Sequence, residues 1–186
     1  AANIAEPGRL AQVEERLEVN QGKLILGFRH GVSYGDGDLE AMVMMNGVLG
    51  SFSHSKLFQN VREKASLAYD VHSVVEKTKG LLSVVAGIAV ENEERAQAII
   101  LDQVEALKAG RISEDELSST RASFLDRLTV IEDSPADLMD LDRVWRLHGR
   151  EFDLPSYRKA VAAVDRERIA AAAARLKLDP VYFLRN

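Results

Sequence analysis

Apolar residues in the second half of the chain recur every three or four positions, which is the spacing of one face of a helix. The clearest stripe comprises Ala96, Ile100, Val104 and Leu107, and Gly110 ends it. Further helices are predicted where a start signal precedes an apolar stripe. These signals are the capping box that begins at Ser113, the Ser134-Pro135 pair, Pro155 and Asp165. The second half is therefore predicted to be helical.

In the first half of the chain, apolar residues recur at a shorter period, and turn residues are more frequent. Strands are predicted at residues 14–19, 23–28, 68–77 and 81–90, with a last strand at 181–184 and helices at 39–48 and 55–65. A turn at 78–80 joins two of these strands into a hairpin. Because hairpins are present and the helices are grouped, the order predicts an α+β fold. We expect an antiparallel or mixed sheet with helices packed on one face.

Length and composition are those of one compact domain. The 186 residues are 46% hydrophobic, which is enough to bury a core, so we expect a single domain over 1–186. Residues 1–13 are predicted to be a loose lead-in, with Pro7-Gly8 as its breaker. Met42, Met44 and Met45 are predicted to fill the core.

Charge and cysteine content narrow the classes of partner. A net charge of -5 without a basic run argues against nucleic acid or an anionic membrane as the main partner. The chain has no cysteine, which excludes disulfides and thiolate metal sites and is compatible with a bacterial-type cytoplasm. No apolar run approaches the roughly 18 residues that a membrane span needs. We expect a protein without a membrane span, in the cytoplasm.

The segment with the most chemical content is the predicted helix–strand junction. Arg62 falls in the last turn of the helix, and Tyr69 falls early in the strand, on the face predicted for Val71. An Arg fork and a Tyr hydroxyl at such a junction can both donate to a peptide carbonyl or to the oxyanion formed from it. Spacing alone favours a plainer interpretation, in which Arg62 pairs with Glu63 or Asp70 and Tyr69 is an ordinary strand aromatic.

The residues of this junction favour the catalytic interpretation. Residues 57–69 read Leu-Phe-Gln-Asn-Val-Arg-Glu-Lys-Ala-Ser-Leu-Ala-Tyr. This run resembles a signature in the C-terminal half of the pitrilysin or insulinase-like zinc peptidases, and we place it near their mitochondrial-processing-peptidase-like branch. The resemblance implies one α+β half-unit of that fold. It also implies that Arg62 and Tyr69 contact substrate backbone beside the scissile bond and stabilise the tetrahedral intermediate.

The zinc motif of that family is missing from the chain. Family members bind zinc through His-x-x-Glu-His on a helix and a downstream Glu, whereas no two histidines here are three or four residues apart. The chain is therefore predicted to have no metal site, and the resemblance implies zinc in a companion half. The histidines are predicted to be surface or cap residues: His30, His54, His72 and His148. Of these, His54 and His72 are expected near the substrate edge, and His72 is a candidate substrate-binding residue.

Two functions from different classes follow from the resemblance. In the first, the chain is the substrate-binding half of a zinc endopeptidase, inactive by itself. Its partners are a peptide substrate and an N-terminal zinc-binding half or a homologous partner subunit. In the second, it is a non-catalytic scaffold or interaction subunit of the same fold. Retention of both Arg62 and Tyr69 favours the peptidase. A lone half with one apolar chamber wall is also expected to form homo-oligomers.

Overall fold

The computed structural model describes residues 11–34 and 36–186, and its centre is a five-stranded mixed sheet. The strand order is β1-β5-β2-β4-β3, so β1 and β3 are the edges. The β1–β5 pair is parallel and the other neighbours are antiparallel. The strands are β1 (Ala11–Arg16), β2 (Gly22–Arg29), β3 (Ala68–Glu76), β4 (Leu81–Ile88) and β5 (Lys177–Arg185). The predicted mixed sheet is confirmed.

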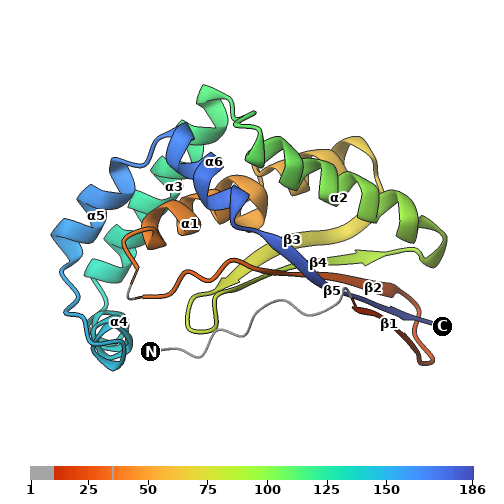
Figure 1. Cartoon of the computed structure of the whole chain (residues 1–186), viewed down its shortest axis with the longest axis horizontal. Helices are drawn as coiled ribbons and strands as arrows, with labels where there is room; N and C mark the ends of the chain where they lie inside the picture. Colours follow the sequence, from red (N-terminus) through yellow and green to blue (C-terminus); the bar gives the residue numbers. More distant parts are fainter. Residues whose placement is uncertain (1–10, 35) are drawn as a thin grey trace.

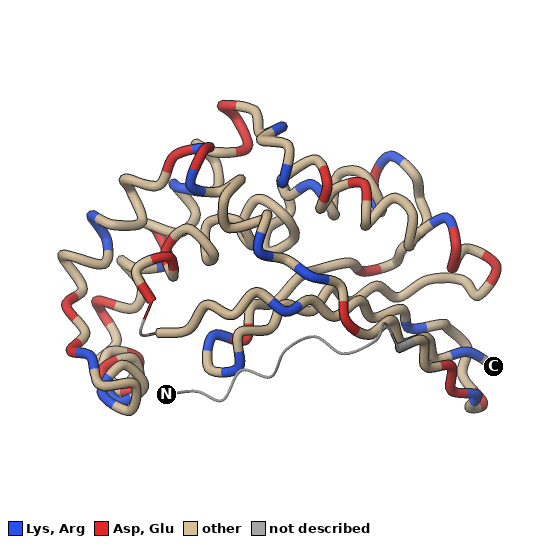
Figure 2. Tube along the Cα trace, viewed as in Figure 1, with Lys and Arg blue, Asp and Glu red and all other residues tan. Residues whose placement is uncertain are grey.

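Helices cover one face of this sheet, as Figure 1 shows, and the predicted α+β class is confirmed. Basic and acidic residues are distributed over the helices and strands rather than gathered on one element (Figure 2). The α-helices are α1 (Leu39–Asn46), α2 (Glu93–Lys108), α3 (Glu114–Glu132), α4 (Pro135–Leu147), α5 (Leu154–Ala162) and α6 (Arg166–Ala174). Two π-helical segments, η1 (Gly47–Ser51) and η2 (Phe58–Lys64), and a 3₁₀ turn, η3 (Val90–Asn92), complete the fold.

The core lies between the helices and the covered face of the sheet. Alternate residues of the two central antiparallel strands are buried there: Leu24, Leu26 and Phe28 on β2, and Leu82, Val84 and Ala86 on β4. Met42, Met44 and Met45 on α1 are fully buried against them. The interpretation of the methionines as core residues is confirmed.

Two glycines allow η1 to lie close to its neighbours. A Cβ on Gly47 would lie 2.5 Å from atoms of Thr120 and Phe124 on α3. A Cβ on Gly50 would lie 2.8 Å from the backbone nitrogen of Ser73 on β3. Gly47 directly follows the last residue of α1, and Gly50 lies within η1. They also place one turn of helix against both α3 and the edge strand, which a sequence pattern does not indicate.

The predicted start of the first strand is wrong. Ala11 already begins β1, because it pairs in register with Pro180 of β5, so the lead-in does not extend to residue 13. Asp38 occupies the N-cap position of α1, but its carboxylate makes no cap hydrogen bond and pairs with Arg175 at 2.8 Å. The predicted breaker Pro7-Gly8 lies outside the described residues.

Candidate functional site

The signature segment forms a helix that reverses sharply into the edge strand. The helix is π-helical over Phe58–Lys64, with Arg62 in its last turn as predicted. It ends in two nested hydrogen bonds, from the Leu67 amide to the Val61 carbonyl (3.0 Å) and from the Ser66 amide to the Arg62 carbonyl (3.1 Å), each one residue wider than in a Schellman motif. Ser66 has a φ of 53°, a conformation that side chains other than glycine adopt at a cost. π-Helical turns and such backbone positions occur often at functional sites.

The position of Tyr69 differs from the prediction. The β3–β4 register passes from Ala68↔Ile88 to Asp70↔Gly87, so Tyr69 is an extra residue in a β-bulge. Its side chain is 69% exposed, whereas Val71 and Ser73 are buried. Tyr69 therefore does not share the buried face of the strand. The bulge, rather than the ordinary alternation of side chains along a strand, sets the direction of its hydroxyl.

Arg62 is also exposed at this junction, with its guanidinium held by weak contacts. The guanidinium lies 4.8 Å from the centre of the Phe58 ring. Its Nε lies 3.8 Å from Oε1 of Glu63, and the Arg62 side chain is 44% exposed. Exposed ion pairs of this length contribute little to stability. The structural partner considered from sequence, Glu63, is thus present, but it leaves Arg62 free to donate elsewhere.

The start of the signature helix is fixed by a buried ion pair. Lys56 is 8% exposed, and its Nζ lies 2.8 Å from the carboxylate of Glu116 on α3. Glu116 also completes the predicted capping box by accepting from the Ser113 amide at 2.8 Å. Burial raises the pKa of Glu116, but the hydrogen bonds from Lys56 and Ser113 outweigh it, so the pKa lies below its ordinary value. The pair attaches the signature helix to the helical layer.

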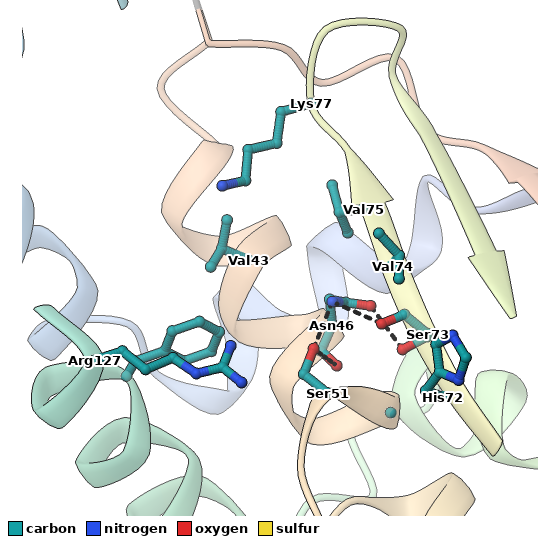
Figure 3. Close-up of a pocket in the computed structure, with 11 residues that line it drawn as sticks. Val43, Asn46, Ser51, His72, Ser73, Val74, Val75, Lys77 and Arg127 are labelled. Carbon is teal, nitrogen blue, oxygen red and sulfur yellow. Dashed lines mark hydrogen bonds between the residues drawn. The ribbon is translucent and has the colours of Figure 1, made fainter. Parts of the chain in front are cut away.

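A cleft runs along β3, on the side away from its strand partner β4. Its volume is about 350 Å³, and its walls come from α1, η1, β3 and α3. A polar network forms its floor: Ser73 Oγ donates to Asn46 Oδ1 at 2.7 Å, and Asn46 Nδ2 donates to Ser51 Oγ at 2.7 Å. Figure 3 shows this network between β3 and η1. Asn46 Nδ2 also lies 3.4 Å from the Ser73 carbonyl, so it fixes the edge strand to the helices.

His72 lines this cleft (Figure 3). Its Nδ1 lies 3.8 Å from the Asp70 carboxylate, and its side chain is 49% exposed. Lys77 and Arg127 line the same cleft but were not among the residues that sequence reasoning selected. Lys77 follows a strand and Arg127 is an exposed residue within a helix, so neither has a spacing that indicates a shared site.

The other three histidines are structural. His54 stacks on Phe52 and its Nε2 lies 3.2 Å from Thr120 Oγ1, so it faces α3 rather than the cleft. His148 caps α4, as predicted, with Nδ1 2.8 Å from the Val144 carbonyl. His30 is buried instead of lying at the surface, its Nδ1 accepts from the Val32 amide, and burial lowers its pKa. The prediction of a surface or cap role is wrong for His30.

Among the residues that the structure describes, no group of three or more His, Cys, Asp or Glu side chains is placed to hold a metal ion. The described residues thus include no ligand set for the zinc that the resemblance assigns to a companion half. Within the same residues, none of the helices is long and apolar enough to cross a membrane.

Known proteins similar to this chain carry the names expected for the signature. Residues 2–124 match the family model described as the peptidase M16 inactive domain. The probable inactive metalloprotease YmfF of Bacillus subtilis is 38% identical over 175 residues, covering 94% of this chain and 41% of that protein. The uncharacterized zinc protease YmxG of the same organism is 26% identical over 168 residues, covering 89% of this chain and 41% of that protein.

A solved structure confirms the fold over nearly the whole chain. The crystal structure of a conserved protein from Enterococcus faecalis has a TM-score of 0.91 at 29% identity, covering 95% of this chain and 42% of that one. The chain thus spans about two fifths of the length of these relatives. The mitochondrial-processing-peptidase-like branch stays a prediction. Because the family model covers more than half of the chain, this chain belongs to the peptidase M16 inactive-domain family, of the pitrilysin-like zinc peptidases.

Proposed function

We propose that this chain is the substrate-binding half of a zinc-dependent endopeptidase. The observation that carries the proposal is the placement of Arg62 and Tyr69. Both are exposed, and they stand on either side of the reversal that leads into the edge strand β3. The cleft lies along that strand. The zinc site would lie in a companion half, either elsewhere in the same precursor or in a partner subunit.

Within this proposal the edge strand binds the peptide backbone. A strand with one unpaired edge can accept an extended peptide as a further strand, and such binding tolerates many sequences because it uses main-chain hydrogen bonds. β3 has β4 as its only strand partner in the described sheet. The proposed role of His72 is a side-chain contact to that peptide from the same strand.

Arg62 and Tyr69 would act at the scissile bond. The Arg62 guanidinium and the Tyr69 hydroxyl are hydrogen-bond donors, and the part of the chain that the structure describes holds no strong partner for either. Donors already in place for the carbonyl oxygen stabilise the negative charge that develops on it in the transition state. The rigid ending of η2 and the bulge at Tyr69 are the local features that hold these two donors.

One finding favours the second function, a non-catalytic interaction subunit. The relative at 38% identity is named a probable inactive metalloprotease. A scaffold of this fold would use the same edge and cleft to hold a partner segment without cleaving it. The relative named a zinc protease favours the peptidase instead. The discriminating property is turnover in the presence of a zinc-bearing half.

Photocrosslinking tests where the peptide lies. We expect Tyr69→p-benzoylphenylalanine to crosslink to a labelled extended peptide, with or without the companion half, because residue 69 borders the proposed peptide site. The matched control is the same replacement at Tyr182 on β5, which β2 and β4 separate from β3. Equal crosslinking at both positions, or none at residue 69, would contradict peptide binding at this edge.

A further inference from the structure

A second, apolar cavity adjoins the cleft along β3. The inner cavity has a volume of about 180 Å³, and its walls include Trp145, Phe152 and Tyr157. Four residues line both spaces: Val43, Lys77, Phe124 and Arg127. Ligand sites for whole small molecules are typically about 300–1,000 Å³. The inner cavity is therefore of a size for one large side chain, and it shares a wall with the cleft along the edge strand.

Two cations stand at the boundary between the cleft and the inner cavity. Lys77 reaches in from the end of the β3–β4 hairpin and Arg127 from α3, as Figure 3 shows. The Lys77 Nζ lies 5.6 Å from the centre of the Tyr34 ring, and the Arg127 guanidinium lies 4.6 Å from the centre of the Phe52 ring. Both contacts are with aromatic rings, which stabilise a cation without neutralising it.

Neither cation has a carboxylate partner within ion-pair distance in the part of the chain that the structure describes. The acid adjacent to Lys77, Glu76, accepts instead from the Thr78 amide at 2.9 Å. Burial lowers the pKa of Lys77, and the charge of Glu76 offsets this in part. A half-buried ammonium that is unpaired has lost hydration without gaining an ion pair, so binding of an anion there is favourable.

We infer that this site binds a peptide carboxylate with a large apolar side chain beside it. The carboxylate would pair with Lys77 and Arg127, and the apolar side chain would enter the inner cavity against Trp145. Arg presents a fork that matches a carboxylate, and Lys adds a point charge. The carboxylate is either an Asp or Glu side chain within the peptide or the free C-terminus of a peptide that ends in the apolar residue.

This inference rests on the proposed peptide binding and adds a substrate class to it. Backbone pairing with β3 gives sequence-tolerant affinity, whereas the cationic boundary and the inner cavity would select among peptides. The net charge of the whole chain is -5, so the preference for an anion would be local to the cleft rather than a property of the surface as a whole.

A binding titration tests the inference without turnover. The chain contains a single tryptophan, Trp145, which is 7% exposed in the wall of the inner cavity, so its fluorescence reports occupancy there. Calorimetry measures Kd independently. Two pairs of short acetylated peptides are compared. One pair has an internal Glu-Phe or Gln-Phe step and an amidated end. The other ends in Phe as the free acid or the amide.

We expect one charged peptide to bind about tenfold tighter than its uncharged twin, the gain typical of one charged hydrogen bond. The pair that shows the preference identifies the source of the carboxylate. Lys77→Met and Arg127→Gln are each expected to abolish the preference. The matched control is Lys79→Met, which removes the same charge two residues away at a side chain outside both cavities. Circular dichroism checks that each variant is folded.

Equal affinity within both peptide pairs, or binding that Lys77→Met and Arg127→Gln leave unchanged, would overturn the inference. Absence of binding by all four peptides would overturn it as well. These outcomes are distinguishable from failure of the proposed function. Crosslinking at residue 69 without any preference for a carboxylate would leave the peptide-binding edge intact and refute only the anionic site.

Discussion

Tyr69→Phe is expected to lower kcat about 10²–10³-fold in the enzyme assembled from this chain and its zinc-bearing half. The substitution removes one hydroxyl and keeps the ring. Because Tyr69 is 69% exposed on a bulge, loss of its hydroxyl leaves the core intact. If the hydroxyl donates chiefly to the transition state, kcat and kcat/KM fall together while KM changes little. Arg62→Ala is expected to have an effect of similar size.

Two control variants separate this effect from a general loss of stability or charge. Tyr182→Phe removes a hydroxyl that lies 2.6 Å from Glu15 on the distant side of the sheet, and Arg95→Ala removes an exposed cation from α2. Both are expected to retain turnover. Tyr69→Phe with the turnover of the unmodified enzyme would refute the catalytic role of the hydroxyl, whatever the effect of Arg62→Ala.

Gly50→Ala is expected to lower the free energy of unfolding by about 1–3 kcal/mol, at the upper end of that range. A Cβ there would lie 2.8 Å from Leu57 Cδ1 and 2.8 Å from the Ser73 backbone nitrogen. A side chain can rotate away from a new methyl group, but the backbone of a strand cannot move without disturbing its pairing with β4. The floor of the cleft would shift with it, since Ser73 belongs to the Asn46 network.

Urea denaturation of the chain measures this effect. Gly37→Ala is the control, because nothing lies within 4 Å of a Cβ at Gly37. It is expected to change stability by less than about 0.5 kcal/mol. Equal midpoints and slopes for the two variants would show that η1 does not pack against β3 as closely as the structure has it.

Periodicity predicts most of this fold because most of its elements bury one face. Both α2, with its stripe from Ala96 to Leu107, and β4, with its alternating pattern, bury one face in the same core. Both elements form where the pattern places them. The cap at Ser113 acts locally, so its capping box also forms as predicted. Pairing to a distant strand has no local signal, which explains why the start of β1 opposite β5 was missed.

For the candidate site, the sequence proposes which residues act but does not give their geometry. The resemblance selected Arg62 and Tyr69, whereas strict alternation put Tyr69 on the buried face. The bulge that exposes it lies opposite Gly87 of the partner strand, where a Cβ would crowd the Asp70 carboxylate. An isolated glycine within a strand pattern is a known sign of a bulge. Gly87 is such a glycine, and a bulge predicted from it would have corrected the prediction that Tyr69 shares the face of Val71.

The boundary cations show a different limit of sequence reasoning. Lys77 and Arg127 are fifty residues apart on unrelated elements, and only the fold brings both to the same two cavities. Neither residue belongs to a motif. Two structural features identify them: they line the same cavities, and neither has a carboxylate partner among the described side chains. Sequence periodicity indicates neither feature.

Hydrolysis of a quenched fluorescent peptide library tests the central claim most directly. The chain is assayed alone, its zinc-bearing companion alone, and the two together. Activity in the mixture only, lost in Arg62→Ala and Tyr69→Phe, is the result expected of a substrate-binding half. A stable complex without hydrolysis would contradict the peptidase function and favour the scaffold. Hydrolysis by this chain alone would contradict the assignment of the zinc site to another half.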